Sequence, residues 1–190
     1  MSPRDRLVTV GTELLEERGL AGISLRSIAG AAGVSHGAPR RYFPTYQALL
    51  AAIARRGLED LDRRIAPALV VDDLRAAARA YLAFAQERPE MFALITRHDL
   101  LEGAGGHLRE VTGRWFADLG ATLARVTGRA IGPEEVLALW SGVHGLAALT
   151  SRRATEPTGV DPTAALDVLL ERHTGKHSTP APRNRGAAKR

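Results

Sequence analysis

Two short helical segments joined by a glycine turn lie between residues 24 and 43, and they constrain the fold more than any other part of the chain. Ser24 stands where a serine caps a helix, and Gly33 stands where a left-handed residue ends one. Ser35 then restarts the pattern as the predicted cap of a second helix. The first segment carries four apolar side chains on one face: Leu25, Ile28, Ala29 and Ala32. The spacing predicts a helix-turn-helix unit.

The second of these segments has almost no aliphatic bulk. It carries His36, Arg40, Arg41 and Tyr42 instead, and Pro39 falls early enough to cost at most one helical hydrogen bond. A helix of this composition has little to bury against a core. Basic and aromatic side chains on a short exposed helix are typical of insertion into the DNA major groove, where arginine can bond the N7 and O6 acceptors of guanine.

Apolar residues recur at helical spacing along the rest of the chain, and no segment shows the alternation of a strand. The first helix is expected to end near Gly19. The fourth is expected to run from Thr45 towards Ala66 and to end at Pro67. Five more segments have the apolar spacing of a helix. The last one is expected to begin at Asp161 and Pro162 and carries the apolar residues Ala165, Leu166, Val168 and Leu169. The expected fold class is therefore all-α.

The stretch from Pro133 to Ser151 is apolar on nearly all of its sides. Its titratable groups are Glu134, Glu135 and His144. A helix without a polar face must be covered on both sides. We expect one side to meet the domain core and the other a second subunit.

The net charge of +5 is unevenly divided along the chain. Residues 1–66 hold ten arginines and seven acidic residues, and residues 67–172 hold eleven arginines and fourteen acidic residues. Residues 173–190 hold five basic residues and no acidic one. A basic N-terminal unit suits a nucleic-acid partner, whereas the acidic middle argues against a chain that coats nucleic acid along its length. Residues 176–190 are expected to form a disordered basic tail.

The composition excludes several classes of function. The chain has no cysteine, which removes disulfides, zinc–cysteine sites and thiol catalysis. It has no apolar run long enough for a membrane span and no signal peptide at its start, so we expect a cytoplasmic protein without a membrane partner. His173 and His177 have the spacing of a metal pair but no third ligand in view. We expect no metal, no cofactor and no catalytic residue, because no phosphate loop, serine elbow or paired carboxylates stand out.

In order and spacing, the first third of the chain resembles the tetracycline-repressor (TetR) family of bacterial one-component regulators. The residues that carry the resemblance are Ser24-Leu25-Arg26-Ser27-Ile28-Ala29, Gly33-Val34-Ser35, Tyr42-Phe43 and Ala48-Leu49-Leu50. Trp140, His144 and Gly145 resemble the Trp-x3-His-Gly pattern of one branch of the family's C-terminal domains. The family usually has a tyrosine where Arg40 stands and a phosphate-binding lysine where Tyr46 stands. Here that phosphate role falls to the Tyr46 hydroxyl or to one of the arginines.

The resemblance implies about nine helices in two domains. Residues 1–48 would form a three-helix DNA-binding domain, and residues 49–175 a helical ligand-binding and dimerisation domain, followed by the tail 176–190. The implied DNA contacts are Arg26, Ser35, His36, Gly37, Ala38, Arg40, Arg41, Tyr42, Thr45 and Tyr46. Six C-terminal residues are candidates for an effector site, although each can equally be core: Phe92, Ile95, Trp115, Phe116, Trp140 and His144.

The implied function is a homodimeric repressor that binds a palindromic double-stranded DNA operator at the bacterial nucleoid and is released by a small hydrophobic or aromatic effector. An activator or a ligand-independent regulator would use the same fold. A rival of another class is an all-α ligand-binding or catalytic protein whose helix-turn-helix is only structural. The basic residues His36, Arg40 and Arg41, on a helix with so little core bulk, argue against that rival.

Overall fold

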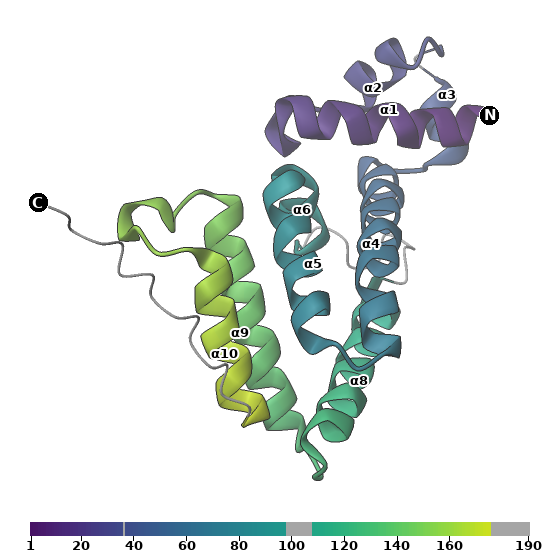
Figure 1. The fold of residues 1–190 in the computed structure, drawn as a ribbon. Coiled ribbons are helices and arrows are strands. Elements are labelled where there is room, and N and C mark those ends of the chain that lie inside the picture. The colour runs from purple at the N-terminus through teal and green to yellow at the C-terminus, as the bar shows by residue number, and fades with distance from the viewer. Residues whose placement is uncertain (36, 98–107, 176–190) are drawn as a thin grey trace, which may run out of the picture.

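The computed structural model describes residues 1–35, 37–97 and 108–175 (Figure 1). Over these residues it contains nine α-helices, two short 3-10 helices and no strand, which confirms the expected all-α fold. His36, the glycine-rich stretch 103–106, His177 and the tail 176–190 lie outside the described residues. No helix in the described part of the chain is long and apolar enough to cross a membrane.

The N-terminal unit is built from three helices, as expected. Its elements are α1 (Pro3–Arg18), a 3-10 turn (Leu20–Gly22), α2 (Leu25–Ala31) and α3 (Ala38–Tyr42). A reciprocal capping box opens α2: the Ser24 hydroxyl accepts from the Ser27 N–H at 3.1 Å, and the Ser27 hydroxyl accepts from the Ser24 N–H at 2.8 Å. Gly33 then has the predicted left-handed backbone, with φ of +64°.

The start of α3 differs from the prediction. Gly37, not Ser35, occupies the N-cap position, and the helix begins at Ala38. Proline explains the difference. A cap at Ser35 would place Pro39 at the first position whose N–H bonds the cap carbonyl, and proline has no N–H to donate. Starting at Ala38 puts Pro39 in the first turn, where that donor is not needed.

The long helix α4 (Tyr46–Val70) leads from the N-terminal unit into the C-terminal domain (Figure 1). Thr45 caps it, its hydroxyl accepting from the Ala48 N–H at 3.1 Å. The expectation that Pro67 ends this helix is wrong, because α4 continues for almost one further turn. Pro67 removes one backbone hydrogen bond, but Ile65 and Leu69 on either side of it pack into the core and hold the turn in place.

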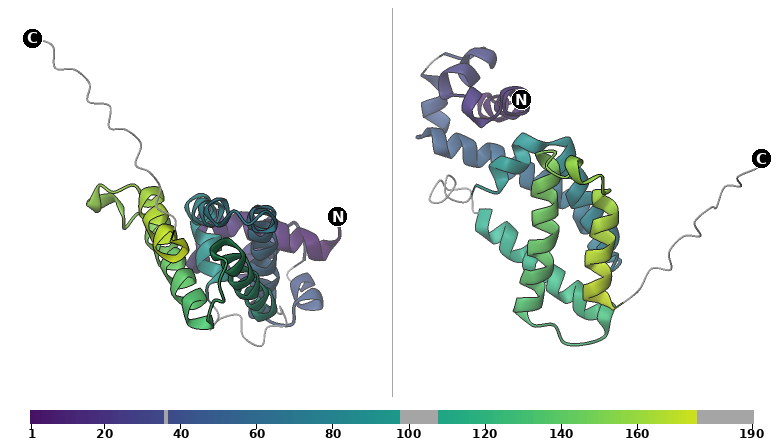
Figure 2. Two further views of the ribbon diagram at one scale, coloured as in Figure 1. Left: turned by 60° about the horizontal axis from the view of Figure 1, so that its bottom comes forward. Right: turned by 90° about the vertical axis from the view of Figure 1, so that its left-hand side faces the viewer.

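Five helices complete the C-terminal domain: α5 (Leu74–Glu87), α6 (Pro89–Ile95), α8 (Leu108–Thr127), α9 (Pro133–Ser151) and α10 (Pro162–Thr174). α9 and α10 lie antiparallel and side by side along one flank, as Figures 1 and 2 both show. Asp161 caps α10 and Pro162 occupies its first turn, as predicted. α10 ends at the end of the molecule that is remote from α3 (Figure 2).

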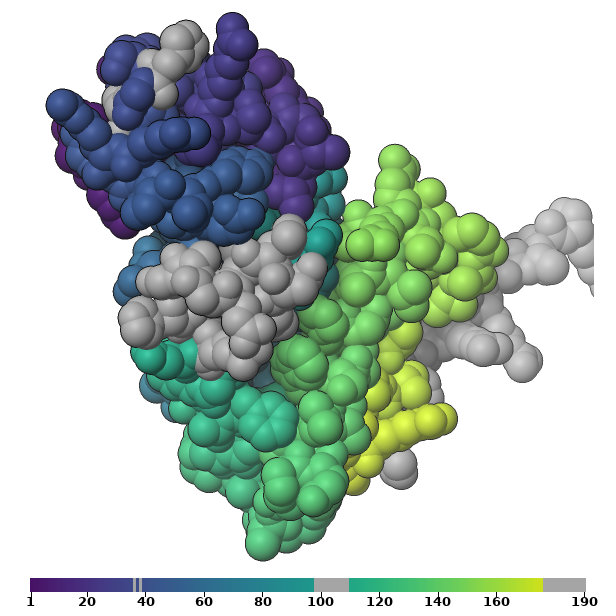
Figure 3. Space-filling model, turned by 180° about the vertical axis from the view of Figure 1, so that it is seen from behind, coloured from purple at the N-terminus to yellow at the C-terminus, as the bar shows by residue number. Residues whose placement is uncertain are grey.

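Three large apolar side chains of α9 and α10 are exposed. Leu137 and Leu149 of α9 and Val168 of α10 each expose about half of their surface, at 52%, 53% and 52%. Figure 3 shows α9 as a continuous ridge of the C-terminal domain between α8 and α10. The placement of Val168 corrects the predicted inward stripe of α10, whose buried side chains are Leu166 and Leu170.

Candidate nucleic-acid interface and C-terminal pocket

Arginines from α2 and α3 share one face of the N-terminal unit. Arg26 and Arg40 line a shallow surface hollow together with Leu25, Gly37 and Pro39. Arg41 is exposed beside Arg40 in the last turn of α3, and Tyr42 exposes 40% of its surface. Within the described part of the chain, Arg26, Arg40 and Arg41 form no ion pair, so their charge is available to an anionic partner.

A small apolar anchor holds α3 against the rest of the unit. Pro39 and Phe43 are buried, with Phe43 only 3% exposed. The guanidinium of Arg4, at the start of α1, lies 5.2 Å from the centre of the Phe43 ring. Sequence reasoning did not single out Arg4, and its only signal was positive charge at the N-terminus. Its position adds a basic group close to the end of α3.

The remaining predicted DNA contacts have different surroundings. Ser35 and Gly37 are exposed, and a Cβ at Gly37 would meet no atom within 4 Å, so its backbone is open to close approach. Thr45 is exposed while its hydroxyl caps α4. Ala38 is the first residue of α3, and the structure does not describe its side chain.

Tyr46 does not fit the role of phosphate donor that was expected of its hydroxyl. That hydroxyl donates to the carbonyl of Ile23 at 3.0 Å, and burial raises the pKa of the phenol. A phenol has one proton to donate, and this one is used between α4 and the start of the helix-turn-helix. The Tyr46 hydroxyl thus connects α4 to the residue before the Ser24 cap, and its contact with DNA stays a prediction.

In the C-terminal domain, helices α4, α5, α6, α8 and α9 surround a cavity of about 330 Å³, which we call the outer chamber. Five of the six residues predicted for an effector site line it: Ile95, Trp115, Phe116, Trp140 and His144. The sixth, Phe92, is 3% exposed and does not line the chamber. Its ring lies behind the wall, 5.5 Å from the His144 ring and 5.6 Å from the Tyr81 ring.

Tyr81 is the residue of this chamber that sequence reasoning missed. Its hydroxyl lies 2.8 Å from Nδ1 of His144, whose ring stacks on Trp140 with centroids 4.9 Å apart. Burial raises the pKa of Tyr81 well above its usual range, so the hydroxyl keeps its proton and can donate to the imidazole. Tyr81 repeats at helical spacing with apolar neighbours such as Ala77 and Ala78, and an aromatic residue in such a pattern is indistinguishable from core.

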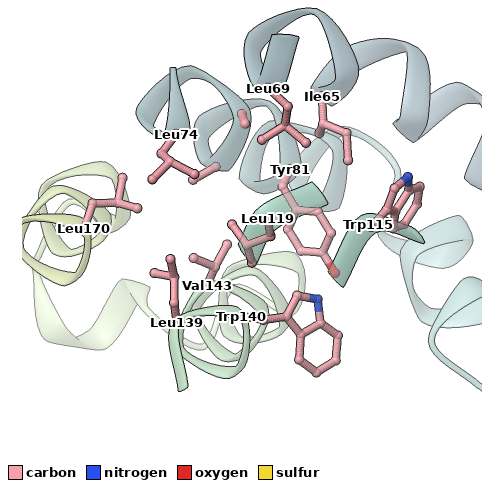
Figure 4. Close-up of a pocket in the computed structure, with 12 residues that line it drawn as sticks. Ile65, Leu69, Leu74, Tyr81, Trp115, Leu119, Leu139, Trp140, Val143 and Leu170 are labelled. Atoms are coloured by element: carbon pink, nitrogen blue, oxygen red, sulfur yellow. The ribbon is translucent and has the colours of Figure 1, made fainter. Parts of the chain in front are cut away.

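A second, smaller cavity of about 70 Å³ shares part of its wall with the outer chamber, and we call it the inner compartment. Tyr81, Trp115 and Trp140 line both spaces. Figure 4 shows their rings at one side of the inner compartment, with aliphatic side chains of α4, α5, α8, α9 and α10 around the rest of it. The three aromatic rings thus form the wall that the two spaces share.

Trp115 is held by a carboxylate outside both spaces. Its indole N–H donates to Oδ1 of Asp62 on α4 at 2.6 Å, and Arg114 lies 3.6 Å from the same oxygen. The bond fixes the ring between the two compartments while its polar edge faces α4. No described residue that lines either space carries a formal charge at neutral pH when His144 is neutral.

Helix α6 connects this pocket to the N-terminal unit. Its last residues, including Ile95, form part of the chamber wall, and the helix also packs against α1. At its start, Arg88 lies 3.1 Å from Glu16 of α1 and 3.0 Å from Asp60 of α4. Burial raises the pKa of Glu16 in spite of the arginine beside it. A displacement of α6 would therefore change its contacts with both α1 and α4.

Two family profiles match this chain over most of its length. The profile described as "Bacterial regulatory proteins, tetR family" matches residues 7–53. The profile described as "Tetracyclin repressor-like, C-terminal domain" matches residues 74–173, which is more than half of the chain. The chain thus belongs to the TetR family of bacterial transcriptional regulators, and its N-terminal unit is a DNA-binding helix-turn-helix. The Trp-x3-His-Gly branch within the family stays a prediction.

Solved structures show the same fold. A protein of unknown function from Rhodococcus sp. RHA1 has 26% sequence identity and a TM-score of 0.77, over 92% of this chain and 95% of that one. The multidrug binding protein EbrR, complexed with imidazole, has 24% identity and a TM-score of 0.64, over 97% and 99% of the two chains. AibR, in complex with isovaleryl coenzyme A and operator DNA, has 16% identity and a TM-score of 0.63, over 80% and 86%. None of the curated proteins compared with this chain matches it.

Proposed function

We propose that this regulator is a repressor that binds a palindromic operator as a homodimer and is released by a small hydrophobic or aromatic effector. One observation carries the proposal. Helix α6 forms part of the wall of an apolar pocket and, through Arg88, is ion-paired to the first helix of the DNA-binding unit. The boundary between the two proposed domains lies at residues 48 and 49, in the first turn of α4.

The DNA-binding role of individual residues rests on exposure and charge. Arg26, Arg40, Arg41 and Tyr42 would contact the operator, together with His36 and the backbone around Gly37. A short helix with unpaired arginines can read base edges and clamp phosphates at once. In its own complex, the fold relative AibR holds operator DNA, which supports an operator as the partner here.

Dimerisation is proposed through the exposed apolar side chains of α9 and α10. Leu149 and Val168 would be covered by the same helices of a second subunit, and so would the exposed part of Leu137, which also borders the outer chamber. A large apolar face that a single copy leaves exposed is typical of such an interface. The dimer would set the separation of two recognition helices, at about 34–36 Å for half-sites one helical turn apart.

Effector binding would act by changing that separation. A ligand shifts an equilibrium only by the difference between its affinities for the two states. Filling the outer chamber moves α6 against α4 and α1, and the paired helix-turn-helix units then no longer fit both half-sites. EbrR and AibR were each solved with a small molecule bound, which supports a ligand-responsive role.

Footprinting of the gene's own upstream region tests the operator and the dimer together. We expect a two-fold symmetric protected site, a dimer by analytical ultracentrifugation at micromolar concentration, and binding that weakens steeply with salt. Leu149→Glu should give a monomer with much weaker operator binding, whereas Glu134→Gln, a charge change at the start of the same helix, should not. A monomeric wild-type protein, or protection of one half-site alone, contradicts the dimer.

Repression and activation are separated by transcription in vitro from the footprinted promoter. A repressor lowers transcript yield as protein is added, and 1-naphthol or another neutral hydrophobic ligand restores it. An increase in transcript with added protein identifies an activator that uses the same fold.

A further inference from the structure

The two cavities of the C-terminal domain differ in volume and in chemistry, and this difference defines a class of ligand. The inner compartment is small, at about 70 Å³, and apart from the three rings that it shares with the outer chamber its lining consists of leucine, isoleucine, valine and alanine side chains. The outer chamber is several times larger, at about 330 Å³, and adds polar groups to its apolar wall.

We propose that the effector is an uncharged amphiphile, with a slender aliphatic chain in the inner compartment and a small polar head in the outer chamber. This inference rests on the proposed effector role of the pocket and names the chemical class that the pocket accepts. Tyr81, Trp115 and Trp140 line both spaces, so a flexible chain that passes their rings reaches from one space into the other.

The lining of the inner compartment supports the chain. Protein interiors hold few voids larger than a water molecule, because an unfilled void lowers stability in proportion to its volume. The apolar lining also offers water no hydrogen-bond partners. Ala77 and Ala78 of α5 keep the space open: each stands among larger aliphatic residues and presents only a methyl group. A polymethylene chain replaces the missing contacts without needing any polar partner.

The outer chamber determines the head group. Its polar side chains are the Tyr81 hydroxyl, the His144 imidazole and the hydroxyls of Thr96 and Thr112. No arginine, lysine or carboxylate lines it among the described residues, so a charged head would lose its hydration without gaining an opposite charge. A carbonyl head can accept from the Tyr81 hydroxyl when Nδ1 of His144 is the donor of their shared bond, and a hydroxyl head can donate to the Tyr81 oxygen.

A series of straight-chain methyl ketones, from 2-pentanone to 2-tridecanone, tests the inference by titration calorimetry. Each methylene that enters the inner compartment should tighten binding about fourfold, until the compartment is full and affinity levels off. Alkanoates and alkylammonium ions of the same chain length should bind at least tenfold more weakly at pH 7.5. An affinity that ignores chain length, or carboxylates that bind as tightly as ketones, overturns the proposal.

Two substitutions with opposite effects locate the chain. Ala78→Leu fills the inner compartment and should move the plateau to shorter ketones, while 2-pentanone binds as before. Val143→Ala enlarges the same space and should move the plateau to longer ones. Ala76→Leu is the matched control, because Ala76 lies two residues away on the exposed face of α5. Equal plateaus in all four proteins would place the chain elsewhere and contradict the assignment.

Operator release, measured in parallel, distinguishes this inference from the proposed function. Ketones that bind with a plateau but leave the operator complex intact support the ligand class and contradict the release mechanism. Release by 1-naphthol, which has no chain, without any binding of the ketones contradicts the ligand class and supports the release mechanism.

Discussion

The face of α2 and α3 exposes its functional side chains, whereas the pocket of the C-terminal domain buries them. Helix α3 has five residues, and Arg40, Arg41 and Tyr42 all face solvent. The pocket is formed by side chains of six helices, and burial raises the pKa of Tyr81 there. Substitutions on the first face should change binding without changing stability, because those side chains support little else. Substitutions in the pocket should change both.

The largest effect should follow from removing both arginines of α3. Arg40→Ala with Arg41→Ala should weaken operator binding by about 1–3 kcal/mol per arginine. The free energy of unfolding should stay within about 0.5 kcal/mol, as is usual for exposed positions. Fluorescence anisotropy across a salt series measures affinity, and a salt slope smaller by about one per lost contact marks a phosphate contact. Arg63→Ala, an exposed arginine on α4, is the control. Unchanged operator affinity in the double variant contradicts the assigned interface.

Pocket substitutions should weaken ligand binding and leave operator binding in the absence of ligand nearly unchanged. Trp140→Ala and His144→Ala remove the stacked pair of the outer chamber and should weaken binding of 1-naphthol or 2-nonanone by about 1–3 kcal/mol each. The affinity of both variants for the operator in the absence of ligand should stay close to that of the wild type. His173→Ala, on α10 outside the pocket lining, should behave as wild type. If both variants fold and still release DNA at the ligand concentration that the wild type needs, these residues only pack in the core and do not contact the ligand.

Arg88 lies between the pocket and the DNA-binding unit, and its replacement should reduce the effect of ligand binding on operator affinity. Arg88→Met keeps the apolar stem but leaves Glu16 and Asp60 without this partner, at a cost of about 1–3 kcal/mol in unfolding free energy. The variant should still bind operator and ligand separately, but ligand should release less DNA at saturation. Arg153→Ala breaks an exposed pair with Glu156 and should cost at most about 1 kcal/mol. Full release by saturated Arg88→Met contradicts the coupling route.

A substitution of Tyr46 tests whether its hydroxyl belongs to the DNA-binding face or to the interior of the protein. Tyr46→Phe removes the hydrogen bond to the Ile23 carbonyl and should lower unfolding free energy by about 1 kcal/mol. Operator affinity should be unchanged, because that hydroxyl is used inside the protein. Denaturant unfolding and anisotropy measure the two quantities. A clear loss of affinity with unchanged stability would restore the phosphate role to Tyr46.

The smallest effect concerns the pH dependence of stability through Glu16. Burial raises its folded pKa above the ordinary value of 4.5, so the folded state favours the protonated carboxyl. The stability that this group contributes is present below pH 4.5 and is lost as pH rises through the folded pKa. Glu16→Gln should therefore remove part of the decline of stability with pH in that window. Chemical denaturation at several pH values measures the slope, and an unaltered slope contradicts a raised pKa.

Much of the DNA-binding unit was predictable because its signals are local. The Ser24 cap, the left-handed Gly33 and the burial of Ile28 and Ala29 depend on neighbours a few residues away in the chain. The wrong start of α3 also has a local reason, because Pro39 shifted it to Ala38. The hydrogen bond from the Tyr46 hydroxyl to the Ile23 carbonyl was not predicted, and its two partners are 23 residues apart in the chain. Helix α9 had the predicted bounds because its apolar residues and Pro133 mark them.

The pocket was only partly predictable because its parts are far apart in the sequence. Composition marked Trp115, Trp140 and His144 as unusual, but Tyr81 is 63 residues from the histidine that it contacts and looked like core. Hydrophobic periodicity specifies which side of a helix turns inward and does not say which inward residues meet a space. The sequence by itself determined the helices, their caps and the charge of the recognition face. Only tertiary packing decided that Ala77 and Ala78 face a void, that Phe92 lies behind the wall, and that Arg88 connects α6 to α1. Cavities and long-range ion pairs arise where elements distant in the chain meet, and no local pattern encodes that geometry.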